Sequence, residues 1–265
     1  MRVQTKVLLL VIVISVAFLV IGFEVAERFG LFLGLISAIG FISLFFTSGN
    51  GISLTFYQTT IQRGNDTWGV YNILKEQCPK VGVAIPEFHV HHHSGDYAYV
   101  VLSLFDKNMI CLSEGLLNRL NVRELQIILA YQLQYLKVTQ GMWFVFVHRI
   151  AECLFSLGLY ADLFLLLGIK KNPPRFFQRV FALISNNLVQ LKFNTSFFRQ
   201  LDQDILDLTK EREQIGDLFW RMRGCQKTHP LFLLACSKHQ FILNPEMSDT
   251  KFSKRLQNIV GYYPV

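Results

Sequence analysis

The chain has 265 residues, of which 51% are hydrophobic and only 17% are charged, and its mean hydropathy is +0.33. Soluble domains carry about a quarter charged residues, so these values argue against an ordinary cytosolic globule, and the abundance of apolar residues excludes intrinsic disorder. The formal net charge of +7 comes from dispersed basic residues without a strongly basic, aromatic-rich run, which argues against a nucleic-acid partner.

Two uncharged runs near the N-terminus predict membrane-spanning helices. The first covers residues 7–23, about 25 Å of helix, which is near the lower limit for crossing a hydrocarbon core of about 30 Å. A charged connector, residues 24–28, follows it in place of the small-residue cleavage site of a signal peptide. We therefore predict a transmembrane hairpin with helices at about 7–23 and 29–46, in an N-terminal region of residues 1–62 that ends in a connecting segment.

The charges that flank this hairpin predict its orientation. Arg2 and Lys6 precede the first helix and Arg63 follows the second, whereas the connector carries Glu24 and Glu27. By the positive-inside rule, the N-terminus and the bulk of the chain face the cytoplasm. We expect a multi-pass integral protein of the cell (inner) membrane, with the lipid bilayer as a partner.

Residues 63–265 are predicted to form a second, mainly cytoplasmic domain. Residues 66–76 have the pattern of a helix, and residues 79–86 link it to a strand. The segment PEFHVHHHSGDYAYVVLSLFDKNMICLSEGLL alternates apolar and polar residues around turn signals at 94–96 and 106–108, which indicates short antiparallel strands.

From Ser113 the pattern becomes helical. Asn121 is then expected to cap the next helix, because Glu124 follows three residues later as in a capping box. That helix, VRELQIILAYQLQYLKVTQ, is predicted to end at about Gln140. The expected fold class is α+β and mostly helical, with a small β-sheet.

Two further hydrophobic helices are predicted at about 142–168 and 176–193, separated by Pro173 and Pro174. Charged and polar residues interrupt the first of them: His148, Arg149, Glu152 and Asp162. One interpretation is an amphipathic pair packed against the cytoplasmic domain, and the other is a second membrane hairpin whose charges face inward. The sequence leaves both open.

A cluster of histidines is the one local group with metal-ligand chemistry. On a strand, His89, His91 and His93 would share one face while His92 points the other way. Such a face could hold zinc, copper or nickel. The alternative, which we favour, is an exposed, polar strand end before the turn at Ser94 and Gly95. Even with a bound metal, Glu87 is the nearest candidate base, and nothing in the sequence fixes its geometry.

Other routes to catalysis lack sequence support. There is no G-x-S-x-G motif and no glycine-rich phosphate loop followed by K-[ST]. The cysteines are never spaced as C-x-x-C, so we expect reduced thiols, and no sequence feature marks one of them as activated. They are Cys78, Cys111, Cys153, Cys225 and Cys236.

Over most of the chain, the order of these segments resembles membrane zinc metallopeptidases of the HtpX and CAAX-prenyl-protease type. The resemblance includes the hairpin, the segment NMICLSEGLLNRLNVREL, the central helix, the hydrophobic pair, a second motif helix and Thr228-His229-Pro230. In that family the central helix carries H-E-x-x-H after an alanine. After Ala130 this chain has instead Tyr131, Gln132, Leu133, Gln134 and Tyr135.

This departure removes the chemistry of the motif. Two imidazoles one helical turn apart hold the zinc, and the glutamate between them acts as general base. A tyrosine phenol must lose a proton with a pKa near 10 to become a ligand, and a glutamine amide cannot accept a proton. The resemblance implies a third ligand from R-E-x-x-A-D, where this chain places Gln200 and keeps Arg199 and Asp204; a register shift would offer Asp202 instead.

The resemblance therefore implies a gluzincin-type domain that has become a pseudopeptidase, with no metal and no cofactor. We expect a scaffold or regulator that binds a membrane protein, an unfolded protein or an active peptidase. The degenerate residues Tyr131, Gln132, Tyr135 and Gln200 either fill the old cleft or line a groove for an extended peptide. The alternatives are a divergent zinc-dependent membrane metalloendopeptidase that uses ligands such as the His89–His93 cluster, and a structural subunit of a membrane complex.

Overall fold

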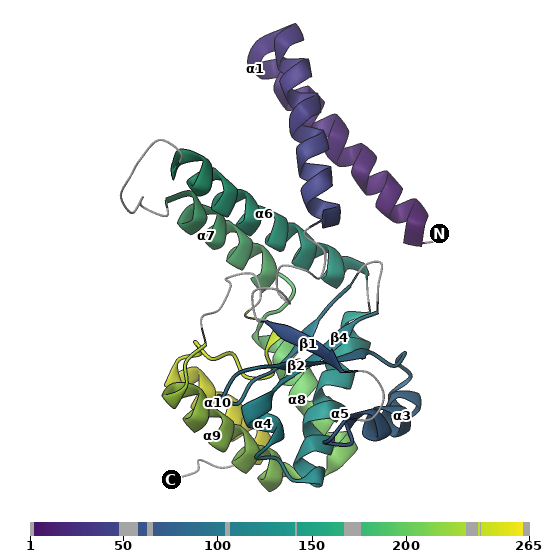
Figure 1. Cartoon of the computed structure of the whole chain (residues 1–265), viewed down its shortest axis with the longest axis vertical. Helices are drawn as coiled ribbons and strands as arrows, with labels where there is room; N and C mark the ends of the chain where they lie inside the picture. The colour runs from purple at the N-terminus through teal and green to yellow at the C-terminus, as the bar shows by residue number, and fades with distance from the viewer. Residues whose placement is uncertain are drawn as a thin grey trace. The chain divides into compact units, whose positions relative to one another are not determined.

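A computed structural model of the protein describes residues 3–47, 58–62, 66–103, 107–140, 142–166, 176–231, 238 and 240–261 (Figure 1). It divides the chain into two compact units, residues 1–49 and 50–265. Asp106, Pro173, Pro174 and Cys236, which the sequence singled out, lie outside the described residues.

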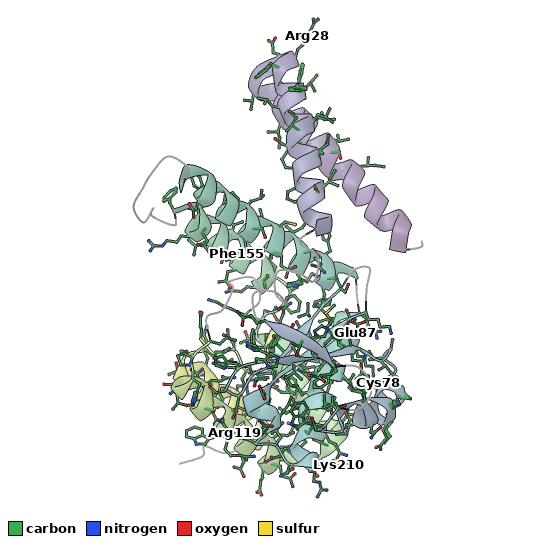
Figure 2. All side chains as sticks on the ribbon, in the orientation of Figure 1. Arg28, Cys78, Glu87, Arg119, Phe155 and Lys210 are labelled. Atoms are coloured by element: carbon green, nitrogen blue, oxygen red, sulfur yellow. The ribbon has the colours of Figure 1, made fainter. Side chains whose placement is uncertain are left out.

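The N-terminal unit consists of one long apolar helix, α1, Val3–Thr47, with a sharp break at Ala26 and Glu27. Glu27 has φ 46°, and the second half of the helix turns back along the first, with Arg28 at the turn (Figure 2). The break falls inside the predicted connector. Within the described residues, Ser15–Ser43 is the one stretch long and apolar enough to cross a membrane.

Glycines let the two halves of α1 approach closely. A Cβ atom added to Gly30 would lie only 1.7 Å from the backbone oxygen of Gly22, and one added to Gly34 would lie 2.5 Å from that of Phe18. Small residues have this role where apolar helices pack without a hydrophobic driving force between them. The close contact between the two halves of α1 thus depends on glycine, which has no side chain, at these positions.

The second unit contains a four-stranded mixed sheet in the order β1-β2-β4-β3. Its strands are β1 (Thr59–Gln62), β2 (Glu87–His91), β3 (Ala98–Val101) and β4 (Met109–Ser113). The β1–β2 and β3–β4 pairs are antiparallel, but β2 and β4 are parallel. The prediction of purely antiparallel strands was therefore wrong: β4 inserts between β2 and β3, and alternation along a strand does not reveal its neighbour.

The helix before β2 also differs from its prediction. It is α3, Val70–Val81, so it begins four residues late and continues through Pro79. The carboxylate of Asp66 accepts hydrogen bonds from the N–H groups of Val70 (2.7 Å) and Tyr71 (2.9 Å), which satisfies the free donors of the first turn. Gly82, with φ 78°, ends the helix in the left-handed conformation.

The central helix follows its prediction closely. After the short α4 (Glu114–Leu117), helix α5 spans Val122–Thr139, and Asn121 and Glu124 form the expected capping box. Helix α5 contacts β3, α3, α8 and α9. The remaining helices of this part are α8 (Thr195–Thr209), α9 (Arg212–Thr228) and α10 (Asp249–Val260).

The two faces of the sheet differ in chemistry. One face presents Phe88 and Val90 of β2 to the main hydrophobic core, which also includes Leu133 and Leu136 of α5. The other face carries His89 and His91 on the same strand. The neighbouring strands place Tyr99, Val101, Met109 and Cys111 on the same face, and these residues form a smaller buried cluster with Tyr97 and Phe241.

Helices α6 (Met142–Leu166) and α7 (Phe176–Gln190) pack against each other in antiparallel directions (Figure 1). The charges that interrupt α6 are buried with partners: Glu152 accepts from Arg149 (2.9 Å) and lies 3.3 Å from Nε2 of His148. Asp162 accepts from the first N–H groups of α7, at Phe177 and Gln178. Paired, inward-facing charges are compatible with both predictions for this helix pair.

Enlarging Gly30 should separate the two halves of α1. In Gly30→Val, we expect the distance between spin labels at Val20 and Leu33 to widen by about 2 Å or more, toward ordinary interhelical spacing. Gly40→Val is the matched control, because a Cβ there meets no atom within 4 Å. The measurement uses pulsed electron resonance on an otherwise cysteine-free chain, and equal distances in the two variants would contradict this packing.

Candidate functional site

The first position of the motif region, Tyr131, belongs to a buried network of three polar side chains. The Tyr131 hydroxyl donates to Oδ1 of Asp202 at 2.5 Å. Arg255 of α10 donates to both carboxylate oxygens of Asp202, at 2.9 Å from Nε and 2.8 Å from Nη2, and also contacts the Tyr131 oxygen. Its Nη1 donates to the backbone oxygen of Ile242 at 2.6 Å. This network joins α5, α8 and α10.

Aromatic rings surround the guanidinium of Arg255. Its central carbon lies 5.7 Å from the ring centroid of Tyr131, 5.5 Å from that of Phe198 and 5.3 Å from that of Phe219. Such rings stabilise a cation through their negative faces, more strongly when water is excluded. The positive charge is therefore held by one carboxylate and three rings.

Burial and charge fix the protonation states in this network. Burial raises the pKa of Tyr131 well above its ordinary value, although the charge of Arg255 opposes this. Burial acts to lower the pKa of Arg255, but the interactions with Asp202 and Tyr131 together outweigh burial and raise that pKa. The phenol stays protonated and the guanidinium stays charged at any ordinary pH.

Tyr135 lies one turn further along α5 in an apolar environment. Its ring stacks on Phe193 (6.2 Å between centroids) and meets the edge of Phe197 (5.7 Å). Its buried hydroxyl makes no hydrogen bond within the described part of the chain. Burial raises the pKa of Tyr135 well above its ordinary value, so this phenol is also neutral.

The two glutamines of the motif region point to different partners. The Gln132 amide donates to the backbone oxygens of Tyr99 (3.1 Å) and Cys111 (3.4 Å), which ties α5 to the sheet. The Gln134 amide donates to Oδ2 of Asp204 at 2.9 Å. Both amides therefore serve as structural hydrogen-bond donors between elements.

The structure brings Asp202, and not Gln200, to the motif region. Gln200 and Arg199 are exposed, whereas Asp202 is only 5% exposed and faces Tyr131. Arg255 was not predicted from the sequence to belong to this site. Its signal is present in α10, where it shares the buried face with Phe252, Leu256 and Ile259. A charge in such a stripe indicates a buried partner elsewhere.

The outer edge of β3 is occupied by the chain itself. Tyr99 forms a β-bridge with Phe241, and the N–H of Ile242 donates to the Ala98 oxygen at 3.0 Å. Strand β1 forms the other edge of the sheet, and its middle residues Thr60 and Ile61 are exposed. A peptide could therefore extend the sheet at β1 without displacing this pairing.

The expectation of an exposed strand end at the histidine cluster was wrong for His89 and His91, which are buried at the end of β2. The rings of His91 and His93 lie 5.4 Å apart, and His92 points away to Thr60 (3.1 Å) and Glu114 (3.3 Å). His89 is buried, with neither ring nitrogen hydrogen-bonded within the described part. In the described residues no group of three or more His, Cys, Asp or Glu side chains is arranged to hold a metal ion.

The residues of the motif region do not suit a zinc ion. Zinc needs ligands with free lone pairs, such as neutral imidazole or carboxylate. Both oxygens of Asp202 already accept from Arg255, whose charge would repel a divalent cation, and the Tyr131 oxygen that contacts Asp202 belongs to a protonated phenol. His229, the remaining motif residue, lies with Cys225 and Thr228, and its backbone oxygen accepts from Tyr97.

No protein-family model matches the chain. A protease HtpX homolog from Desulfatibacillum aliphaticivorans is 24% identical to it over 134 residues, which make up 51% of this chain and 43% of that relative. The chain thus spans less than half of the length of this curated relative. The similarity is distant and agrees with the resemblance in the sequence.

Removing the buried cation should destabilise the second unit strongly. Arg255→Met leaves the Asp202 carboxylate buried without its counter-ion, which typically costs about 3–5 kcal/mol. Lys254→Met is the matched control on the exposed face of α10, where a change within about 0.5 kcal/mol is expected. Denaturant unfolding followed by circular dichroism measures both, and similar losses in the two variants would count against the network.

Stability should fall in acid because His91 is buried. Burial, with the neighbouring His93 and His92, lowers the pKa of His91 from 6.5 to about 4. The folded pKa is below the unfolded one, so the contribution is present above pH 6.5 and is lost as the pH falls toward 4, by up to about 3 kcal/mol. We expect His91→Gln to flatten this decrease, and half-exposed His92→Gln to retain it, in unfolding measured across this pH range.

Proposed function

We propose that this chain is an HtpX-like membrane pseudopeptidase that holds a partner protein at the membrane instead of cleaving it. The observation that carries this proposal is the ion pair between Arg255 and Asp202, which lies against Tyr131 of the degenerate motif. The guanidinium of Arg255 lies beside the positions where a metallopeptidase of this type would need ligands for its catalytic metal ion.

The motif region lacks the groups that metal-dependent hydrolysis requires. A metal-bound water requires a metal with an open coordination position and a base that can take a proton. The Tyr131 phenol is neutral, Asp202 is saturated by Arg255, and the Gln132 amide is used as a donor to the sheet. These residues support packing of α5 against α8 and the sheet, and offer no group that could activate water.

Anchoring in a bilayer is supported by α1. Its apolar stretch Ser15–Ser43 has the length and composition of a membrane segment, and the break at Glu27 allows the helix to return to the side from which it came. Arg2 and Lys6 precede the apolar segment, and Arg63 is the first basic residue after it. These positive charges favour a cytoplasmic location for residues 50–265. The lipid bilayer is therefore the first proposed partner.

Partner binding is supported by the edge of the sheet at β1. Thr60 and Ile61 are exposed there, and β1 pairs with β2 on its other side. An exposed strand edge offers backbone donors and acceptors to an extended segment. We propose an unfolded or membrane-derived protein segment as the occupant, or a segment of an active peptidase that the chain regulates.

The proposal predicts that the purified full-length chain neither retains stoichiometric zinc nor cleaves casein. We expect less than about 0.1 zinc per chain by elemental analysis, because the site lacks suitable ligands. Casein digestion in the same detergent should stay at the level of a protein-free sample. An active HtpX-type enzyme prepared identically provides the positive control.

Two results would contradict this. One is about one zinc per chain together with cleavage that a chelator abolishes. The other is chelator-sensitive cleavage that is lost in a variant with His89, His91 and His93 all changed to Ala but retained in Arg255→Met. The second result would assign the activity to the histidine cluster and favour the divergent metallopeptidase.

A further inference from the structure

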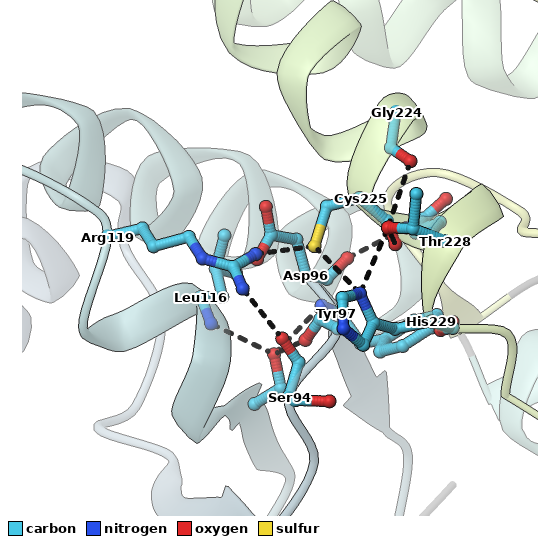
Figure 3. A network of polar contacts seen from close by, with 12 residues as sticks. Ser94, Asp96, Tyr97, Leu116, Arg119, Gly224, Cys225, Thr228 and His229 are labelled. Atoms are coloured by element: carbon cyan, nitrogen blue, oxygen red, sulfur yellow. Dashed lines mark hydrogen bonds and ion pairs between the residues drawn. The ribbon is translucent and has the colours of Figure 1, made fainter.

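Three segments that lie far apart in the sequence meet around the thiol of Cys225 (Figure 3). They are the turn between β2 and β3, which includes Ser94 and Asp96, the turn between α4 and α5, which carries Arg119, and the last turn of α9 with His229. This group is separate from the Tyr131–Asp202–Arg255 network. The sequence motifs gave no role to Cys225 or Arg119.

Arg119 brings a positive charge to the sulfur. Its Nη1 donates to Sγ of Cys225 and also to Oδ1 of Asp96 at 2.8 Å, and its Nη2 donates to the Ser94 oxygen at 3.1 Å. This contact places a cation where negative charge develops on the sulfur during thiol–disulfide exchange. The negative charge of Asp96 opposes this effect. Arg119 and Arg221 both attract the Asp96 carboxylate electrostatically, which offsets part of its charge.

His229 provides a proton acceptor one helical turn after Cys225. Its Nδ1 lies 3.9 Å from Sγ and 3.0 Å from Oγ1 of Thr228. The Thr228 hydroxyl donates to the Cys225 backbone oxygen at 2.9 Å. The imidazole of His229 therefore lies beside the sulfur, where it can take up a proton during the exchange.

The thiol borders a small cavity of about 180 Å³. Its lining combines the charged groups Asp96, Arg119 and Arg221 with apolar side chains such as Leu116 and Met222. The space suits one half of a small disulfide compound. Arg119 and Arg221 pair with Asp96 and Glu124, and their partly exposed guanidinium groups add positive charge at the cavity that favours a compound with carboxylates.

The other described cysteines have a different environment. Cys78, Cys111 and Cys153 are buried, whereas Cys225 is partly exposed. Burial raises the pKa of the Cys78 and Cys111 thiols, which keeps them protonated and inert. Among these four thiols, Cys225 alone combines access with cationic neighbours.

From this cluster we infer that Cys225 is a modification site, where the thiol exchanges with a small, carboxylate-bearing disulfide to form a mixed disulfide. The inference goes beyond the proposed function and does not depend on it, because it involves neither the degenerate motif nor a bound partner. It gives the domain a way to respond to the thiol–disulfide state of its surroundings.

The exchange balances without any further reagent. The Cys225 proton passes to Nδ1 of His229, and the thiolate electron pair attacks one sulfur of the disulfide. A new bond forms between Sγ and that sulfur while the original S–S bond breaks. The second sulfur leaves with the bonding pair and takes the proton from His229, so one thiol is oxidised to the mixed disulfide as another is released.

The test treats the detergent-solubilised full-length chain, carrying Cys236→Ser, with oxidised glutathione at pH 6.5 and follows each cysteine by mass spectrometry. An unperturbed thiol is only about 1% thiolate at this pH. We expect Cys225 to react at least about tenfold faster in the folded chain than in the same chain unfolded in urea. An uncharged dithiodiethanol probe should react more slowly than oxidised glutathione with the folded chain.

Variants separate the role of charge from that of access. Arg119→Gln and His229→Asn should each reduce the folded rate about tenfold or more, and Arg119→Lys should restore part of it. Arg123→Gln is the matched control, since this exposed arginine pairs with Glu211 and should leave the rate unchanged. Where Arg119→Gln unfolds the chain, Arg119→Lys and His229→Asn carry the comparison.

The inference is overturned if folded Cys225 reacts no faster than unfolded Cys225, or if the Arg119 and Arg123 variants that fold react equally. Equal rates with the charged and uncharged disulfides would overturn the assignment of a carboxylate-bearing partner.

Discussion

The packing of the second unit depends on one buried cation, the guanidinium of Arg255. It is almost fully removed from water and is compensated by both oxygens of Asp202, by the Ile242 backbone oxygen and by three aromatic rings. A buried charge is costly unless every partner is in place. The arrangement therefore fixes α5, α8 and α10 relative to one another, and it does so where a metallopeptidase would place its metal ligands.

The neighbouring residues of α5 also take part in packing. Gln132 donates to the sheet, Gln134 donates to Asp204, and Tyr135 fills an aromatic cluster with Phe193 and Phe197. Segment 240–243 covers the edge of β3 as a further strand would. Each contact increases burial or satisfies a backbone group, and none supplies a base. These contacts make the motif region part of the packed interior of the second unit.

Polar chemistry in the rest of the unit is concentrated at places where segments meet. Glu152 neutralises Arg149 inside α6, and Asp162 satisfies the first donors of α7, so the interrupted hydrophobic helix is stabilised by its own charges. Around Cys225, Arg119 connects two turns and a helix end. The Cys225 site also borders a cavity of about 180 Å³, which gives a small molecule access to it.

The sequence by itself determined the local features. It predicted the break in the apolar N-terminal segment, the capping box of Asn121 and Glu124, the extent of α5 and the opposite directions of His91 and His92, because these depend on neighbours within a few residues. Only the tertiary structure decided that β2 lies parallel to β4, that Asp202 rather than Gln200 faces Tyr131, and that Arg255 completes this site. Strand order and ion pairing join residues between about 20 and 120 positions apart, and they follow from which surfaces bury each other, which periodicity along one segment does not encode.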